Sequence, residues 1–139
     1  MNLKRWAKYL LIPPDRGRPV VVAVDESGEN IDIQEFKNLM EWHDSPLGML
    51  FRPETIEIYT EKWPEEGTVD FIELQKTNSL KTDEILKDAH GVSLESRVIN
   101  WLNLLATDWN KAVPLNLTSV FVPDIIGRTA EASIEEITK

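Results

Sequence analysis

The sequence contains no cysteine among its 139 residues. This absence excludes disulfide bonds, thiolate catalysis and zinc sites with cysteine ligands. Small secreted domains are usually cross-linked by disulfides, so the composition favours a cytoplasmic protein. The chain also lacks any stretch near the ~20 apolar residues that are needed to span a bilayer. The N-terminal apolar run is interrupted by a lysine and has no small-residue cleavage site, so we expect no signal peptide.

Catalytic motifs are also scarce. The only two histidines, His43 and His90, have no spacing typical of a zinc site. Each stands at the predicted end of a helix, where the helix dipole favours a cation, which is more typical of a helix cap than of a catalytic base. The sequence has no Gly-x-Ser-x-Gly elbow and no glycine-rich phosphate-binding motif. No motif therefore fixes a reaction, and we predict no cofactor.

Positive charge is scarce outside the first eighteen residues. That segment carries five basic residues and one acid, whereas the remaining chain carries ten basic and twenty-three acidic residues. A segment of +4 therefore precedes a body of −13, which gives the net charge of −9. A negative body repels nucleic acids and anionic membranes, and it associates rapidly with basic partners. We therefore expect a basic protein partner and no direct binding of nucleic acid, which requires a basic face.

The length of the chain and its apolar segments predict a single domain that can bury a hydrophobic core. Residues 20–24 are apolar at every position, which predicts a central strand that is buried on both faces. Residues 55–60 alternate with a period of two, as in a half-buried strand. Residues 69–74 and 117–122 are strand-like as well.

Helical spacing of apolar residues predicts four helices. The predicted helices span residues 2–11, 32–43, 82–90 and 94–111. Asp32 and Ser93 stand at the start of the second and the fourth, where their side chains can cap the first turn.

The order of these elements predicts an α+β fold, a small mixed sheet of about four or five strands with helices on one or both faces. A three-layer α/β sandwich is the alternative. We expect three segments: a basic amphipathic helix and proline-rich loop over 1–18, a single α+β domain over 19–123, and a weakly ordered or helical tail over 124–139. The connection through residues 32–43 can cross over to a parallel strand.

The five tryptophans are many for a chain of this length. Trp101 fits the apolar stripe of the long helix, whereas Trp42 lies off the stripe of its helix and Trp63 lies in a loop. Exposed tryptophan among carboxylates is typical of an interface that faces basic residues. In the alternative interpretation Trp63 folds back over the hairpin. The predicted partner-binding residues are Trp42, Trp63, Glu57, Glu61, Glu65 and Glu66.

The acids of the central strand and the hairpin suggest an alternative, a metal site made of Asp25, Glu57, Asp70 and Glu73. The string from Asp70 to Gln75 resembles the acid and acid-x-Lys pattern of restriction-endonuclease-type nucleases, with glutamine in place of lysine. A strand that ends in an acid, as at Asp25, also resembles the start of RNase H-like folds. Asp70 and Glu73, however, point to opposite faces of one strand. Gln75, moreover, cannot transfer a proton.

These observations predict a non-enzymatic acidic binding module, an inhibitor, immunity-type protein or small subunit, that recognises a basic partner surface. One alternative is the metal-dependent phosphodiesterase. The other is a self-assembling structural component, of phage type, in which the helix over 2–11 docks on a second copy and forms a homo-oligomer.

Overall fold

The computed structural model describes residues 6–27, 32–62, 73–122 and 124–137, and within this part the chain is an α+β protein with one mixed sheet. The fold class predicted from the sequence is therefore confirmed, although the sheet has six strands and is larger than expected. The strands are β1 (Ala7–Ile12), β2 (Val20–Val24), β3 (Leu47–Phe51), β4 (Thr55–Lys62), β5 (Glu73–Lys81) and β6 (Ser133–Glu136). Their order across the sheet is β5-β4-β3-β2-β1-β6.

The centre of the sheet is a strand–helix–strand crossover. Strand β2 leads through α1 (Ile33–Trp42) into β3, which lies parallel to β2, whereas the other described pairs are antiparallel. Both the buried central strand over 20–24 and the crossover agree with the sequence pattern. Asp32 is the N-cap residue of α1, as predicted, although its side chain makes no capping hydrogen bond.

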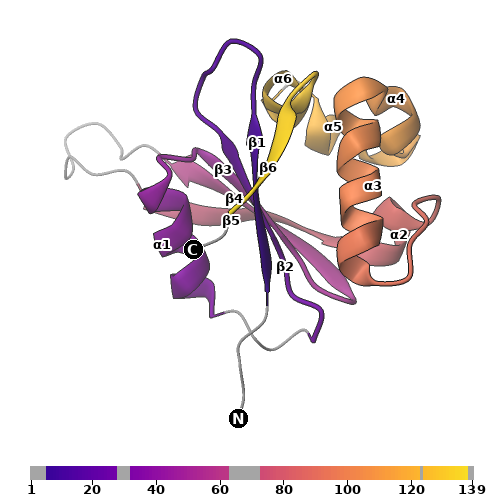
Figure 1. Ribbon diagram of the computed structural model, residues 1–139, viewed down its shortest axis with the longest axis horizontal. Coiled ribbons are helices and arrows are strands. Elements are labelled where there is room, and N and C mark those ends of the chain that lie inside the picture. Colours follow the sequence, from indigo (N-terminus) through magenta and orange to yellow (C-terminus); the bar gives the residue numbers. More distant parts are fainter. Residues whose placement is uncertain (1–5, 28–31, 63–72, 123, 138–139) are drawn as a thin grey trace.

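Helices cover both faces of the sheet. Figure 1 shows α1 alone on one side and the remaining helices on the other side. These helices are α2 (Thr82–Leu86), α3 (Leu94–Thr107), α4 (Trp109–Ala112), α5 (Thr118–Phe121) and α6 (Asp124–Thr129), with a 3-10 turn η1 (Leu115–Leu117) between α4 and α5. Within the described part of the chain, no helix is long and apolar enough to cross a membrane.

Strand β2 divides its side chains between two cores. Val20, Val22 and Val24 face the large core under α3, whereas Val21 and Ala23 face the small core under α1. All five are completely buried, because a strand covered on both faces has no solvent side. Trp101 of α3 anchors the large core and contacts the rings of Phe51 and Phe121 edge-on.

Helix α1 packs closely on the sheet at Gly48. A Cβ atom at this glycine would lie 2.6 Å from Met40 Sδ and 2.8 Å from the ring of Phe36. The missing side chain therefore lets the predicted apolar stripe of α1 approach β3 directly. Phe36 and Met40 are completely buried as a result.

The predicted helix over residues 2–11 is wrong for the described residues, because Ala7–Ile12 form β1. β1 pairs with β2 on one edge and with β6 on the other. Its apolar residues satisfy both a helical and a strand period, and Tyr9 and Leu11 are buried on the α3 side of the sheet. Residues 7–12 therefore belong to the sheet and do not form a helix that could dock on a second copy.

Two further predictions were wrong near the end of the chain. Residues 117–122, predicted as a strand, lie in η1, α5 and the following turn. The segment over 124–139, expected to be a weakly ordered or helical tail, contains α6, which ends at Thr129, and the edge strand β6. The long helix breaks at Asp108, where φ is −154°, so α3 and α4 are separate.

Candidate functional site

The C-terminal end of α1 presents an exposed tryptophan. Trp42 is 84% exposed, whereas the large apolar residues of the same helix lie against the sheet. His43 follows as the C-cap residue, in agreement with the sequence, and the next residue, Asp44, has a φ of 53°. Glu41 and Asp44 are both exposed beside the indole-bearing position. We call Glu41, Trp42 and Asp44 the α1 corner.

The basic N-terminal segment contributes an arginine to this corner. Arg18 Nη2 lies 3.0 Å from Asp44 Oδ1, and Arg18 Nη1 donates to Glu61 Oε1 at 3.0 Å. The hydrogen bond to Glu61 raises the pKa of Arg18 above its usual value. The side chain of Glu61 is only 14% exposed, whereas that of Asp44 is 81% exposed. Arg18 therefore pairs with both acids, and the less exposed Glu61 has the larger effect on the pKa of Arg18. A small hollow of about 150 Å³ lies beside the corner, between Met40 and Leu74.

A second group of charges lies at the other end of the same sheet face. Arg52 Nη1 lies 2.9 Å from Asp25 Oδ2, and Arg52 Nε lies 3.3 Å from Glu57 Oε2. The O–H of Tyr59 donates to Glu57 Oε1 at 2.8 Å. Burial, followed by this hydrogen bond, raises the pKa of the Tyr59 phenol. Asp25, Arg52, Glu57 and Tyr59 form a connected network, and we call it the Arg52 network.

The structure separates the acids that the sequence grouped together. Glu57 and Glu61 lie on the α1 face of β4, each with a side chain about 15% exposed, and each is bound by an arginine. They are therefore poorly placed to receive a basic partner directly. Trp63, Glu65 and Glu66 lie outside the described residues.

The metal site predicted from the sequence gains no support from the Arg52 network. Asp25 and Glu57 do converge, but the guanidinium of Arg52 lies between them. Asp70 lies outside the described residues, and although Glu73 begins β5, its side chain is not described. Among the described residues, no three His, Asp or Glu side chains are grouped so that they could hold a metal ion.

Sequence reasoning missed the role of Glu26. Its two carboxylate oxygens accept hydrogen bonds from the backbone N–H groups of Leu94 and Glu95, each at 3.1 Å. Glu26 thus caps α3 together with Ser93, whose side chain accepts from Ser96 N. No sequence signal reveals this cap, because the partners lie 68 and 69 residues apart.

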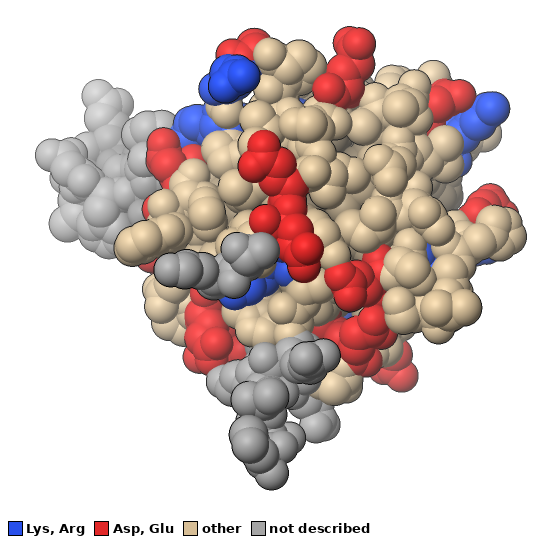
Figure 2. Space-filling model, in the orientation of Figure 1, with Lys and Arg blue, Asp and Glu red and all other residues tan. Residues whose placement is uncertain are grey.

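On the face shown in Figure 2, acidic side chains run through the middle of the surface, and others lie toward its edges. Two basic residues of the N-terminal segment interact with other side chains of the protein. The Lys8 ammonium lies over the ring of Trp6, 5.1 Å from its centroid, and Arg18 forms ion pairs with Asp44 and Glu61. Lys4 and Arg5 lie outside the described residues.

No family model matches this chain, and comparisons with curated proteins and with solved structures give no match.

Proposed function

We propose that this protein is a non-enzymatic binding module that recognises a basic surface of another protein through the α1 corner. The observation that carries the proposal is the exposure of Trp42, 84%, at the end of a helix whose other apolar residues are covered. Large aromatic residues are enriched among the residues that dominate binding energy at protein interfaces. The adjoining Glu41 gives the surface around the indole a negative charge, which suits lysine and arginine on a partner. Asp44 contributes less, because its carboxylate is paired with Arg18.

The overall charge supports the same class of partner. A net charge of −9 accelerates association with a cationic protein and disfavours nucleic acid. The proposal covers an inhibitor, an immunity-type protein and a small subunit of a complex, and a basic partner surface is what these three roles would share.

A site-specific cross-linker tests the proposal. A photoreactive phenylalanine analogue replaces Trp42 in one variant and Val92, which is also fully exposed, in a control variant. After irradiation in the native cell, we expect from position 42 a discrete cross-linked protein that does not form from position 92. The same adduct from both positions, or none from position 42, would contradict the proposal.

The partner identified by cross-linking is then purified, and its binding to charge-changing variants is measured. Glu41→Lys should weaken its binding by about fivefold at low salt, whereas Glu54→Lys, an equal charge change in the β3–β4 loop, should change it little. Binding that does not respond to salt would argue against a basic partner surface.

A further inference from the structure

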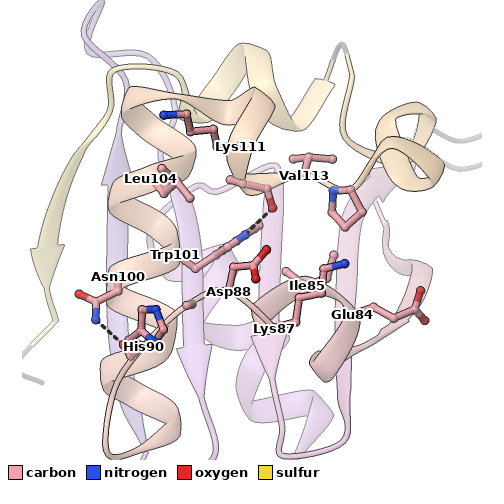
Figure 3. Close-up of a pocket in the computed structure, with 13 residues that line it drawn as sticks. Glu84, Ile85, Lys87, Asp88, His90, Asn100, Trp101, Leu104, Lys111 and Val113 are labelled. Atoms are coloured by element: carbon pink, nitrogen blue, oxygen red, sulfur yellow. Dashed lines mark hydrogen bonds between the residues drawn. The ribbon is translucent and has the colours of Figure 1, made fainter.

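The opposite face of the sheet carries a groove between α2, α3 and α4. Its main hollow has a volume of about 430 Å³ and is lined by residues of α2 and the following loop, of α3, and of the chain from Lys111 to Pro114. This volume lies within the range of roughly 300–1,000 Å³ that is typical of small-ligand sites. Figure 3 shows Trp101 near the centre of the lining side chains, with Asp88 below its hydrogen bond to Ala112.

The floor of this hollow is apolar, and the one side-chain N–H group in it already has a hydrogen-bond partner within the protein. Ile85, Trp101, Ala112 and Val113 are each at most 5% exposed. The indole N–H of Trp101 donates to the backbone oxygen of Ala112 at 2.9 Å, so it needs no partner from a ligand. A floor of this kind favours an apolar group, because a polar group placed there would lose its hydrogen bonds to water.

The groove continues into a second hollow of about 230 Å³. The two hollows share Glu84, Lys87 and Pro114, and the second also contains Asp83 and Asn116. The α2 side of the groove therefore carries three exposed acids, Asp83, Glu84 and Asp88, against one base, Lys87. Leu115, 94% exposed, follows the shared Pro114 in the chain.

Lys111 does not reverse this charge. Its Nζ lies 3.7 Å from Asp108 Oδ2, so an acid that does not line the groove partly neutralises it. In Figure 3 Lys111 lies at one end of the lining residues and Glu84 at the other.

We propose that this groove binds a short peptide segment of a partner protein, with a bulky apolar side chain in the main hollow and a lysine or arginine in the second. Residues i and i+2 of an extended peptide point to the same side, so such a segment can fill both hollows at once. The groove lies on the α3 side of the sheet and Trp42 on the α1 side, so the two binding surfaces can act independently.

Capped tripeptides test the proposal on the full-length, ¹⁵N-labelled protein by NMR. The probe is acetyl-Phe-Gly-Lys-amide, and the comparators are acetyl-Phe-Gly-Glu-amide and acetyl-Ser-Gly-Lys-amide. We expect the probe to cause saturable shifts of the Trp101 indole N–H and of the amides that line the groove, with a Kd of about 1 mM. Glu84→Gln should weaken the probe about threefold, as expected for one exposed ion pair. The matched variant Glu54→Gln, in the β3–β4 loop, should leave it unchanged.

Two results would overturn the inference. One is the absence of saturable shifts in the groove at about 10 mM probe. The other is equal binding of either comparator, since the charge or the apolar anchor would then not matter. Either result leaves the cross-linking at Trp42 unaffected, so failure here is distinguishable from failure of the proposed function.

Discussion

Asp25 and Arg52 form an ion pair at the carboxyl ends of the neighbouring parallel strands β2 and β3, with Arg52 Nη1 2.9 Å from Asp25 Oδ2. The side chain of Asp25 is completely buried, and that of Arg52 is 16% exposed. The backbone N–H of Asp25 also donates to the carbonyl oxygen of Phe51 at 2.8 Å. The pair therefore links the two strands where the chain leaves β2 for α1.

We predict that Arg52→Met lowers the free energy of unfolding by about 3–5 kcal/mol. The substitution keeps an apolar stem but leaves Asp25 buried without its cation. Urea denaturation at neutral pH measures the effect. The double variant Asp25→Asn/Arg52→Met should be more stable than the single variant, because it removes the uncompensated charge. If the double variant were the less stable one, buried charge would not be the cause.

We predict that Glu26→Ala lowers the free energy of unfolding by about 1 kcal/mol, because α3 loses two hydrogen bonds and an anion at its N-terminus. Thermal unfolding should show a fall in Tm of about 3 °C. Glu54→Ala, which removes an exposed acid from the β3–β4 loop, is the matched control and should change Tm little. Equal effects of the two substitutions would show that net charge, not the cap, matters.

The sequence predicted best where pattern and neighbours agree. Residues 20–24 are apolar throughout, so they can be buried together only as a strand that is covered on both faces. Residues 33–42 have a single apolar stripe, which is buried only if the segment forms a helix. β2, α1 and the parallel β3 form as expected for this reason. β4 was also predicted, because Ile56 and Ile58 alternate with polar residues and are buried in the structure.

The sequence misled where a short segment fits both periods. Residues 7–12 can form a helix or a strand, and the hydrogen bonds offered by β2 and β6 on its two edges decide the outcome. The partner β6 lies more than 120 residues away in the chain, so no local signal reveals it. Residues 118–121 were predicted as part of a strand from their composition but form a short helix. In this helix Phe121 packs against Trp101.

The candidate site was only partly predictable. The position of Trp42 off the apolar stripe of its helix predicted its exposure, and the structure confirms it. The arginines that bind Glu57 and Glu61 could not be foreseen, because Arg18 lies 43 residues from Glu61 and the role of Arg52 depends on the register of β3 and β4. The groove depends on how three helices pack, which is a tertiary property.

We predict opposite behaviour for two tryptophans. Trp101→Ala should cost about 3–5 kcal/mol of stability, since this side chain is 2% exposed and contacts Phe51 and Phe121. Trp42→Ala should change stability by less than about 0.5 kcal/mol, because its side chain lies largely in solvent. Urea denaturation of both variants measures the difference. A large loss for Trp42→Ala would mean that the residue is structural, and loss of binding in that variant could then not be assigned to the α1 corner.

The two tyrosines of the chain should resist ionisation while the protein is folded. Tyr9 and Tyr59 are both buried, and each donates to a glutamate, Glu95 and Glu57 respectively. Burial is the main cause that raises both pKa values, and the hydrogen bonds to the carboxylates raise them further. Because the sequence has only these two tyrosines, the near-ultraviolet absorbance of tyrosinate reports on both and on nothing else.

The sign of the pH dependence follows from these raised values. In the unfolded chain tyrosine loses its proton near pH ~10, whereas in the folded chain it keeps it. Unfolding therefore releases protons above about pH 10, and stability should fall by about 1.4 kcal/mol per pH unit for each tyrosine. Absorbance titration combined with circular dichroism should show tyrosinate appearing only as the fold is lost. The variant Tyr9→Phe/Tyr59→Phe should lose less stability between pH 9 and 11, an interval of about two units around the free tyrosine pKa. Tyrosinate that appears near pH 10 in a protein still folded by circular dichroism would show that the two phenols are not held by burial and by their glutamates.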